Sequence, residues 1–168
     1  GRIDAPLVTP SAGATPFGFA FDKRGAALVS EAFGGAAGAS AVSSYVFEDW
    51  KPAQPLLVSA SVGTTQTAAC WVVVTPNGRY AYVTNTGSGT ISSYAVQRSG
   101  RIRLLAGVAA LSAGAPIDAA VSADGRGLFV LNSAAGAITS YLIGHDGALA
   151  AAGSLPGLPA GTNGLAAN

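Results

Sequence analysis

The stretch ACWVVVTPNGRYAYVTN, at residues 69–85, decides the fold. Two apolar runs flank the polar turn TPNG, at residues 75–78. Asn and Gly reverse a chain sharply, because both tolerate the left-handed backbone region. Short apolar runs that are rich in Val and Tyr and bounded by turn residues are typical of β-strands. The stretch therefore predicts two strands joined by a tight turn.

The same pattern occurs three times along the chain. PFGFAFDKRGAALVSEA at 16–32 precedes this stretch, and PIDAAVSADGRGLFVLN at 116–132 follows it. After each comes a Gly-rich segment, then a third run that contains a tyrosine, then a fourth short run beyond another turn. Each unit thus predicts four short strands. Because Gly interrupts the Ala-rich stretches every few residues, we expect no helices.

Four-stranded units of about 45 residues are the blades of β-propellers. The sequence therefore predicts an all-β protein, with residues 1–168 as a single partial propeller domain. The expected parts are an outer strand of a preceding blade at 1–9, blades at 16–60, 68–107 and 115–153, and a C-terminal closing segment at 154–168.

The motif YVTN at 82–85, followed by GSGTI at 87–91, is the signature of YVTN-type propeller repeats. TPFGFAFDKRG, VSEAFGG, QTAACWVVVT and GLPAGTNGLAA add to the likeness. Over essentially its full length the chain resembles the C-terminal half of the lactonase-like seven-bladed propellers, the 6-phosphogluconolactonase and carboxymuconate-cyclase superfamily. This resemblance implies a seven-bladed ring and hydrolysis of a sugar lactone or a related cyclic ester.

Three blades are too few to close such a ring. They would leave two apolar blade faces open, which is an aggregation liability. We therefore expect the remaining blades of the propeller, as an N-terminal half or a second chain, to be the partner of this chain. A homodimer that pools six blades is the alternative.

The composition excludes several other partners. Nine Lys and Arg residues balance eight Asp and Glu residues, for a net charge of +1. No basic surface for nucleic acid or an anionic membrane is expected from this balance. No apolar run reaches the ~18 residues that span a bilayer. The single cysteine excludes a disulfide framework. It fits the cytoplasm, which we slightly favour over a secreted or periplasmic location.

Asp118 is the first candidate catalytic residue. It lies in the innermost strand expected for the third unit, aligned with Trp71 and Gly18. A carboxylate there can face the central channel and act as a general base or a cation ligand. The alternative is an aspartate that hydrogen-bonds loop amides. Most other charged residues, Asp22 among them, fall in turns or outer strands, where we expect them to be solvated.

Glu31 is the second candidate catalytic residue. With a one-residue gap it aligns with Asn85 and Asn132, which end the second strands of their units and are expected to bridge their own turns. Glutamate at this place differs from the other two units. We therefore consider Glu31 an acid–base group or cation ligand.

Trp71, Gln66 and Thr67 are the candidate ligand-binding residues, at the mouth of the channel; core packing is the alternative for Trp71. Cys70 is expected to be a buried free thiol. No metal site is predicted, because His145 is the only imidazole. No cofactor is expected, although a divalent cation is left open.

Two functions remain open. In active members of the lactonase superfamily, channel Arg, His and Glu residues stabilise the developing oxyanion and move protons, often from an innermost-strand Pro-Arg-His motif. The pairs at that place here are Phe17-Gly18, Cys70-Trp71 and Ile117-Asp118. The resemblance favours a lactonase, whereas the missing Arg and His favour a non-catalytic scaffold that binds a small ligand or a protein at the channel mouth.

Overall fold

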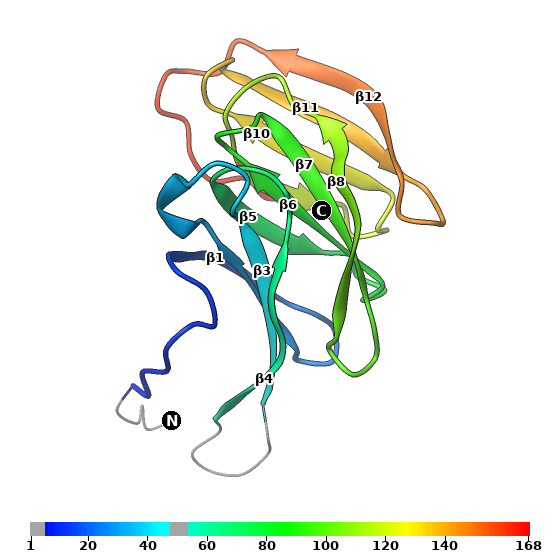
Figure 1. Cartoon of the computed structure of the whole chain (residues 1–168). Helices are drawn as coiled ribbons and strands as arrows, with labels where there is room; N and C mark the ends of the chain where they lie inside the picture. Colours follow the sequence, from blue (N-terminus) through cyan, green and yellow to red (C-terminus); the bar gives the residue numbers. More distant parts are fainter. Residues whose placement is uncertain (1–5, 48–53) are drawn as a thin grey trace.

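The computed structural model describes residues 6–47 and 54–168, and all positions below refer to these. They form three four-stranded antiparallel sheets (Figure 1). Blade 1 contains β1 (Pro16–Phe21), β2 (Ala27–Glu31), β3 (Ala41–Phe47) and β4 (Pro55–Gly63). Blade 2 contains β5 (Ala69–Val74), β6 (Tyr80–Asn85), β7 (Thr90–Val96) and β8 (Ile102–Leu111). Blade 3 contains β9 (Pro116–Val121), β10 (Gly127–Asn132), β11 (Ala137–Ile143) and β12 (Leu149–Pro156).

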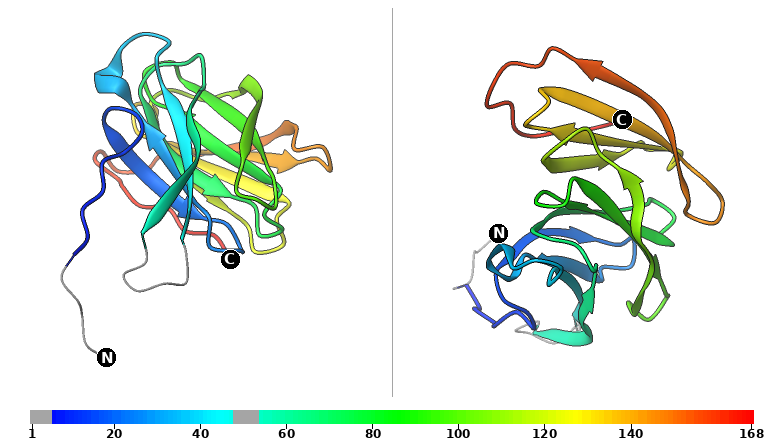
Figure 2. Two further views of the ribbon diagram at one scale, coloured as in Figure 1. Left: turned by 60° about the horizontal axis from the view of Figure 1, so that its bottom comes forward. Right: turned by 45° about the horizontal axis from the view of Figure 1, so that its top comes forward.

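Within each sheet the strands are hydrogen-bonded in chain order. Among the first strands, β5 contacts both β1 and β9, while the later strands of each blade fan outward (Figure 2). This is the arrangement of consecutive propeller blades. The predicted all-β fold, a partial propeller, is confirmed. One short helical element, the 3-10 turn η1 (Phe33–Gly35), lies in the long β2–β3 loop, where the sequence predicted no helix.

The first turn of every blade closes in the same way. The amides of Gly25, Gly78 and Gly125 donate to the carbonyl three residues earlier, at 3.0, 2.7 and 2.8 Å. All three glycines have a positive φ, between 67° and 87°, which a residue with a Cβ adopts only at a cost. The predicted Gly turns are therefore present, and they fix the register of the first two strands of each blade.

Asp22 is buried, contrary to the expectation of a solvated turn residue. Its Oδ1 accepts hydrogen bonds from the amides of Arg24 and Ala26 at 2.8 and 2.9 Å, and its Oδ2 pairs with the Arg24 guanidinium at 3.0 Å. The turn amides and the cation compensate the carboxylate for lost water. Asp22 thus stabilises the first turn of blade 1.

The repeated tyrosine of the third strand joins each blade to the one before it. The Tyr94 hydroxyl donates to the carbonyl of Val62, in β4, at 2.8 Å. The Tyr141 hydroxyl donates to the carbonyl of Leu111, in β8, at 2.6 Å. Burial raises the pKa of Tyr94, with the nearby Glu31 carboxylate adding to the shift, so its hydroxyl stays a donor. This tyrosine therefore recurs because its hydroxyl bonds one blade to the blade before it.

Tyr45 makes the corresponding contact with the segment that precedes β1. Its hydroxyl accepts the amide of Ala12 at 2.8 Å. In blades 2 and 3 the tyrosine contacts the end of the fourth strand of the preceding blade. In blade 1 the segment before β1 lies in that place. The outer strand expected at 1–9 is not formed at residues 6–9, and residues 1–5 lie outside the described part. A strand there would pair with the third strand of a preceding blade, which this chain does not contain.

Two apolar clusters form the core, and each lies between neighbouring blades. Leu28 and Val42 of blade 1 pack with Val72 and Val83 of blade 2. In the second cluster, side chains of blade 2 pack with side chains of blade 3, among them Tyr82, Ile91, Leu128 and Val130. Because the apolar surface is buried between sheets, each blade depends on its neighbours for stability.

The outward faces of the first and third blades are exposed, as the sequence predicted. In blade 1, Phe19 and Phe21 are 61% and 55% exposed. In blade 3, Leu142 and Leu155 are 59% and 62% exposed. These are the faces on which further blades of a ring would pack.

Gly147 allows a test of the contact between blades 2 and 3. A Cβ there would lie 2.5 Å from Cδ1 of Tyr80, and its φ is +83°. Gly25 has a similar φ of +87°, but a Cβ there would meet nothing within 4 Å. We expect Gly25→Ala to lower the free energy of unfolding by about 1 kcal/mol through backbone strain alone. Gly147→Ala should cost about 2–4 kcal/mol, because overpacking adds to the strain. Urea unfolding of the chain measures both; equal losses would contradict the packing argument.

Candidate functional site

The innermost strand of every blade is irregular at the same place. The pairing of β1 with β2 shifts between Pro16 and Phe19, and that of β5 with β6 shifts between Ala69 and Val72. In β9 the shift lies beside Asp118. A bulge re-aims the side chain that it carries, and bulges are common next to active sites. The bulges make this row of residues the candidate site.

Trp71 lies in the bulge of β5 and is 37% exposed. Its backbone amide donates to Oγ1 of Thr84, in the next strand, at 2.9 Å. Its ring lies close to Gly18 of β1: a Cβ on Gly18 would lie 3.2 Å from the Trp71 ring and 2.7 Å from the Cys70 carbonyl. Gly18 therefore lets the two inner strands approach, and the indole presents part of its surface to solvent.

Asp118 lies at the bulge of β9, opposite Leu131 and next to the unpaired Ile117, and is 9% exposed. Its Oδ1 accepts the amide of Ala119 at 2.7 Å, and its Oδ2 accepts the amide of Leu165 at 2.8 Å. Burial raises the pKa of the Asp118 carboxyl, and these two backbone donors oppose the shift in part. A carboxyl with a raised pKa suits proton transfer nearer neutral pH. The amide contacts agree with the structural alternative as well.

Cys70 precedes Trp71 and is half-buried. Its thiol donates to the carbonyl of Ile117, in β9, at 3.3 Å. Burial raises the pKa of the thiol; a hydrogen bond with Thr86 lowers it in part, and the Asp118 carboxylate raises it further. The thiol therefore stays protonated at neutral pH, and a protonated thiol is a poor nucleophile.

Glu31 is fully buried in blade 1, at the end of β2. Its Oε1 accepts from the Ser43 hydroxyl at 2.6 Å and from the Gly13 amide at 2.8 Å. Ser11 donates to the same oxygen at 3.1 Å, and Ser61 donates to Oε2 at 2.7 Å. Four donors compensate the carboxylate for lost water. Glu31 thereby connects the segment before β1 to three strands of its blade.

The predicted alignment of Glu31 with Asn85 and Asn132 is present in the structure. Asn85 Nδ2 donates to the Ser92 hydroxyl at 2.9 Å, and Asn132 Nδ2 donates to the Thr139 hydroxyl at 3.1 Å. In blade 1 this hydrogen bond runs the other way, because the Ser43 hydroxyl donates to the Glu31 carboxylate. The hydroxyl partners recur at one repeat position, and this recurrence is a signal in the sequence from which the pairing could have been predicted.

Gln66 and Thr67 lie in the β4–β5 loop. Gln66 Oε1 accepts from the Thr90 hydroxyl at 3.1 Å, and Thr67 Oγ1 accepts from the Gly38 amide at 3.0 Å. These bonds join the β4–β5 loop to the start of β7 and to the β2–β3 loop. Within the described residues, none of their hydrogen bonds reaches Trp71 or Asp118. The structure thus places Trp71 and Asp118 at equivalent bulges of two inner strands. Glu31 is buried in blade 1, and Gln66 and Thr67 lie in the β4–β5 loop. The catalytic and ligand-binding roles of these five residues stay predictions.

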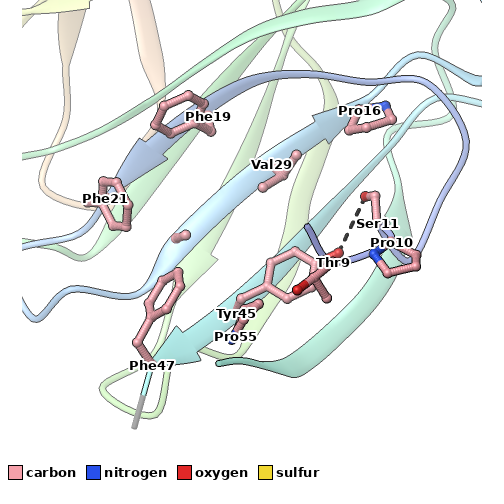
Figure 3. A pocket seen from close by; sticks show the side chains of 11 residues that line it. Thr9, Pro10, Ser11, Pro16, Phe19, Phe21, Val29, Tyr45, Phe47 and Pro55 are labelled. Carbon is pink, nitrogen blue, oxygen red and sulfur yellow. Dashed lines mark hydrogen bonds between the residues drawn. The ribbon is translucent and has the colours of Figure 1, made fainter. Parts of the chain in front are cut away.

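A cavity of about 290 Å³ lies elsewhere, on the open face of blade 1 (Figure 3). Phe19, Phe21 and Phe47 border it from β1 and β3, and Ser11 lies at its edge beside the Tyr45 hydroxyl. Among residues 6–47 and 54–168, the lining is mostly apolar, and Tyr45 is its one titratable group. It is part of the exposed face of blade 1.

No three His, Cys, Asp or Glu side chains among residues 6–47 and 54–168 gather closely enough to hold a metal ion. The same residues contain no helix with the length and hydropathy of a membrane span. His145 lies exposed in the β11–β12 turn.

The model of one protein family, described as "Lactonase, 7-bladed beta-propeller", matches residues 38–162. The chain belongs to this family. The match includes Trp71 and Asp118, together with blades 2 and 3 entire and strands β3 and β4 of blade 1. The resemblance to lactonase-like propellers, which rests on the sequence repeats, is thereby confirmed. No curated protein matches the chain.

Solved structures share the fold. A functionally unknown protein from Desulfotomaculum acetoxidans is 20% identical with a TM-score of 0.70, and the match covers 84% of this chain and 42% of that one. A candidate 6-phosphogluconolactonase from Bacteroides uniformis is 19% identical with a TM-score of 0.70, over 84% of this chain and 41% of that one. The periplasmic gluconolactonase of Pseudomonas aeruginosa is 20% identical with a TM-score of 0.65, over 89% and 42%. This lactonase-family chain thus spans less than half the length of these propellers.

Glu31 can be tested as an anchor. We expect Glu31→Ala to lower the free energy of unfolding by about 3–5 kcal/mol, because four donors lose their acceptor and a cavity remains. Glu31→Gln keeps the shape and one acceptor oxygen, so it should cost about 1–2 kcal/mol. Urea unfolding measures the losses, and amide exchange at Gly13 should accelerate only in the Ala variant. Equal, small losses in both variants would show that Glu31 does not hold the segment.

The raised pKa of Asp118 predicts the direction in which the free energy of unfolding changes with pH. Its pKa is raised in the folded chain, so the unfolded chain releases the proton first as the pH rises. The wild type should therefore lose stability relative to Asp118→Asn as the pH rises past the unfolded pKa of about 3.9 and through the raised pKa of the folded chain. Asp124 is the matched control: its pKa is lowered by the Ser122 hydroxyl, so the wild type should gain stability relative to Asp124→Asn. Unfolding free energies measured across this range test both signs; a difference for Asp118 that does not change with pH would refute the burial argument.

Proposed function

We propose that the complete propeller hydrolyses a sugar lactone or a related cyclic ester at its central channel. The observation that carries this proposal is the pair of equivalent bulges that present Trp71 and Asp118 on the inner strands of a lactonase-family chain. The names of two similar structures, a candidate 6-phosphogluconolactonase and a gluconolactonase, support the same substrate class.

Hydrolysis of a lactone needs a water activated as a nucleophile, and donors that stabilise the oxyanion. In this proposal Asp118 accepts the proton from the attacking water, since each of its oxygens keeps a lone pair beyond its bond to a backbone amide. The exposed part of the Trp71 ring packs against the apolar face of the sugar. Oxyanion donors, and further ligands of any divalent cation, come from blades outside this chain.

The other predicted residues take secondary roles. Gln66 and Thr67 border the channel mouth in the β4–β5 loop, where they hold the loops that a ligand passes. Glu31 is enclosed by four donors and is fully buried, so it acts as a positioning residue rather than touching substrate.

A second candidate is a non-catalytic scaffold that binds a small ligand or a protein at the channel mouth. The observation in its favour is that β1, β5 and β9 contain no His or Arg, so this part of the ring offers no cationic oxyanion donor. Asp118 would then serve only as an acceptor for backbone amides.

Turnover of gluconolactone-type substrates by the complete propeller separates the two candidates. We expect Asp118→Asn to lower kcat by about 100-fold or more with KM changed less than about threefold, because a general base acts on the chemical step. Asp124→Asn, in an exposed turn, is the control and should be unchanged. Assays with and without divalent cations show whether a metal contributes.

Full activity of Asp118→Asn would remove this residue from the site. A wild type that binds lactones without turning them over, at any cation concentration, would instead favour the scaffold.

A further inference from the structure

The dipeptide Asn-Gly occurs twice in the chain, at Asn77-Gly78 and at Asn163-Gly164. In such a dipeptide the backbone nitrogen of the glycine attacks the side-chain carbonyl carbon of the asparagine, because glycine has no Cβ to hinder the approach. The attack needs a glycine nitrogen that can lose its proton and an asparagine side chain that can turn towards it. The two places in this structure differ in both respects.

Asn77 is held by the first turn of blade 2. Its Oδ1 accepts hydrogen bonds from the Thr75 hydroxyl at 2.8 Å and from the Arg79 amide at 2.9 Å. The amide of Gly78 donates to the Thr75 carbonyl at 2.7 Å, and Gly78 is buried. The asparagine side chain and the glycine nitrogen are therefore both fixed, and the attack requires the turn to open.

Asn163 lies in the segment after β12, where it and Gly164 are exposed and belong to no strand. Nδ2 of Asn163 donates to the Gly161 carbonyl at 3.2 Å, which is the one hydrogen bond of this side chain within the described residues. No atom of residues 6–47 and 54–168 accepts the amide of Gly164. The carbon and the nitrogen can thus meet here while the three blades stay folded.

We propose that Asn163 is a site of spontaneous deamidation whose product alters the contact between Asp118 and Leu165. The Gly164 nitrogen bonds to Cγ of Asn163, the bond from Cγ to Nδ2 breaks, and the amide proton leaves with the side-chain NH2 as ammonia. Water then opens the resulting succinimide ring. Cleavage of the new bond gives aspartate, whereas cleavage at the backbone carbonyl gives isoaspartate, in which the main chain runs through Cβ and Cγ.

The product lies next to the contact that Asp118 makes after β12. Oδ2 of Asp118 accepts the amide of Leu165 at 2.8 Å, and Leu165 follows Asn163 by two residues. Either product adds a negative charge here, which favours the protonated form of Asp118, a weaker acceptor for the amide. Isoaspartate also lengthens the main chain just before Leu165, which displaces its amide. Both changes weaken the bond between Asp118 and Leu165.

Deamidation rates at the two Asn-Gly sites test the proposal within one molecule. The 168-residue chain is incubated at neutral pH, both folded and in guanidinium chloride. Peptide mass spectrometry follows the replacement of NH2 by OH at each asparagine. In the unfolded chain we expect similar rates at both sites. In the folded chain the rate at Asn77 should fall at least about 10-fold, while that at Asn163 should stay within about threefold of its unfolded value.

Two variants separate the chemistry from its effect. Gly164→Ala should abolish conversion at Asn163 and leave Asn77 unchanged, because the added Cβ hinders the attack but meets nothing within 4 Å in the fold. Asn163→Asp carries the charge with an unaltered main chain. We expect the Leu165 amide to exchange at least about 10-fold faster in the isoaspartate form than in fresh wild type, with Asn163→Asp between the two.

Three results would overturn the proposal. One is equal rates at Asn77 and Asn163 in the folded chain, whether both fall or neither does. Another is conversion at Asn163 in Gly164→Ala as fast as in the wild type, because the backbone nitrogen would then take no part. The third is unchanged exchange of the Leu165 amide after full conversion, which would leave the Asp118 contact unaffected.

Discussion

The structure depends on contact between neighbouring blades. Each blade is a meander of four short strands with too little surface to bury its apolar residues alone, so both core clusters lie between sheets. The hydroxyls of Tyr94 and Tyr141 add a directional bond to this packing, because each reaches a carbonyl on the fourth strand of the preceding blade. In blade 1 the Tyr45 hydroxyl instead accepts the amide of Ala12, in the segment before β1.

The candidate site follows from this arrangement. Stacked blades bring three inner strands together, and the equivalent bulges place Gly18, Trp71 and Asp118 in one row. Only the last two carry a side chain that can act on a ligand. Asp118 has a raised pKa, and its carboxylate also accepts the amide of Leu165, in the segment after β12. Glu31 shows the opposite use of a buried carboxylate, in which four donors hold it for structure.

Membership of the lactonase family and the exposed apolar faces of blades 1 and 3 both fit a ring with more blades than these three. The family model describes seven blades, whereas the described residues form three. Strands β1, β5 and β9 contain no Arg, Lys or His, so they offer no cationic side chain to an oxyanion. Inner strands with few charged side chains are compatible with an active ring, because residues of several blades together form a site in the central channel.

The sequence by itself determined the strands, the turns and the repeated tyrosines, because turn chemistry and the alternation of apolar residues act over a few neighbouring positions. It also placed Trp71 and Asp118 on inner strands, and Glu31 level with two asparagines. Only the tertiary structure decided the partners of the carboxylates. Asp118 meets an amide 47 residues away and Glu31 meets a hydroxyl 30 residues away. Asp22 was expected in solvent but is buried, since its exposure depends on how the turn of blade 1 packs. Such contacts arise when sheets pack, and no local pattern encodes them.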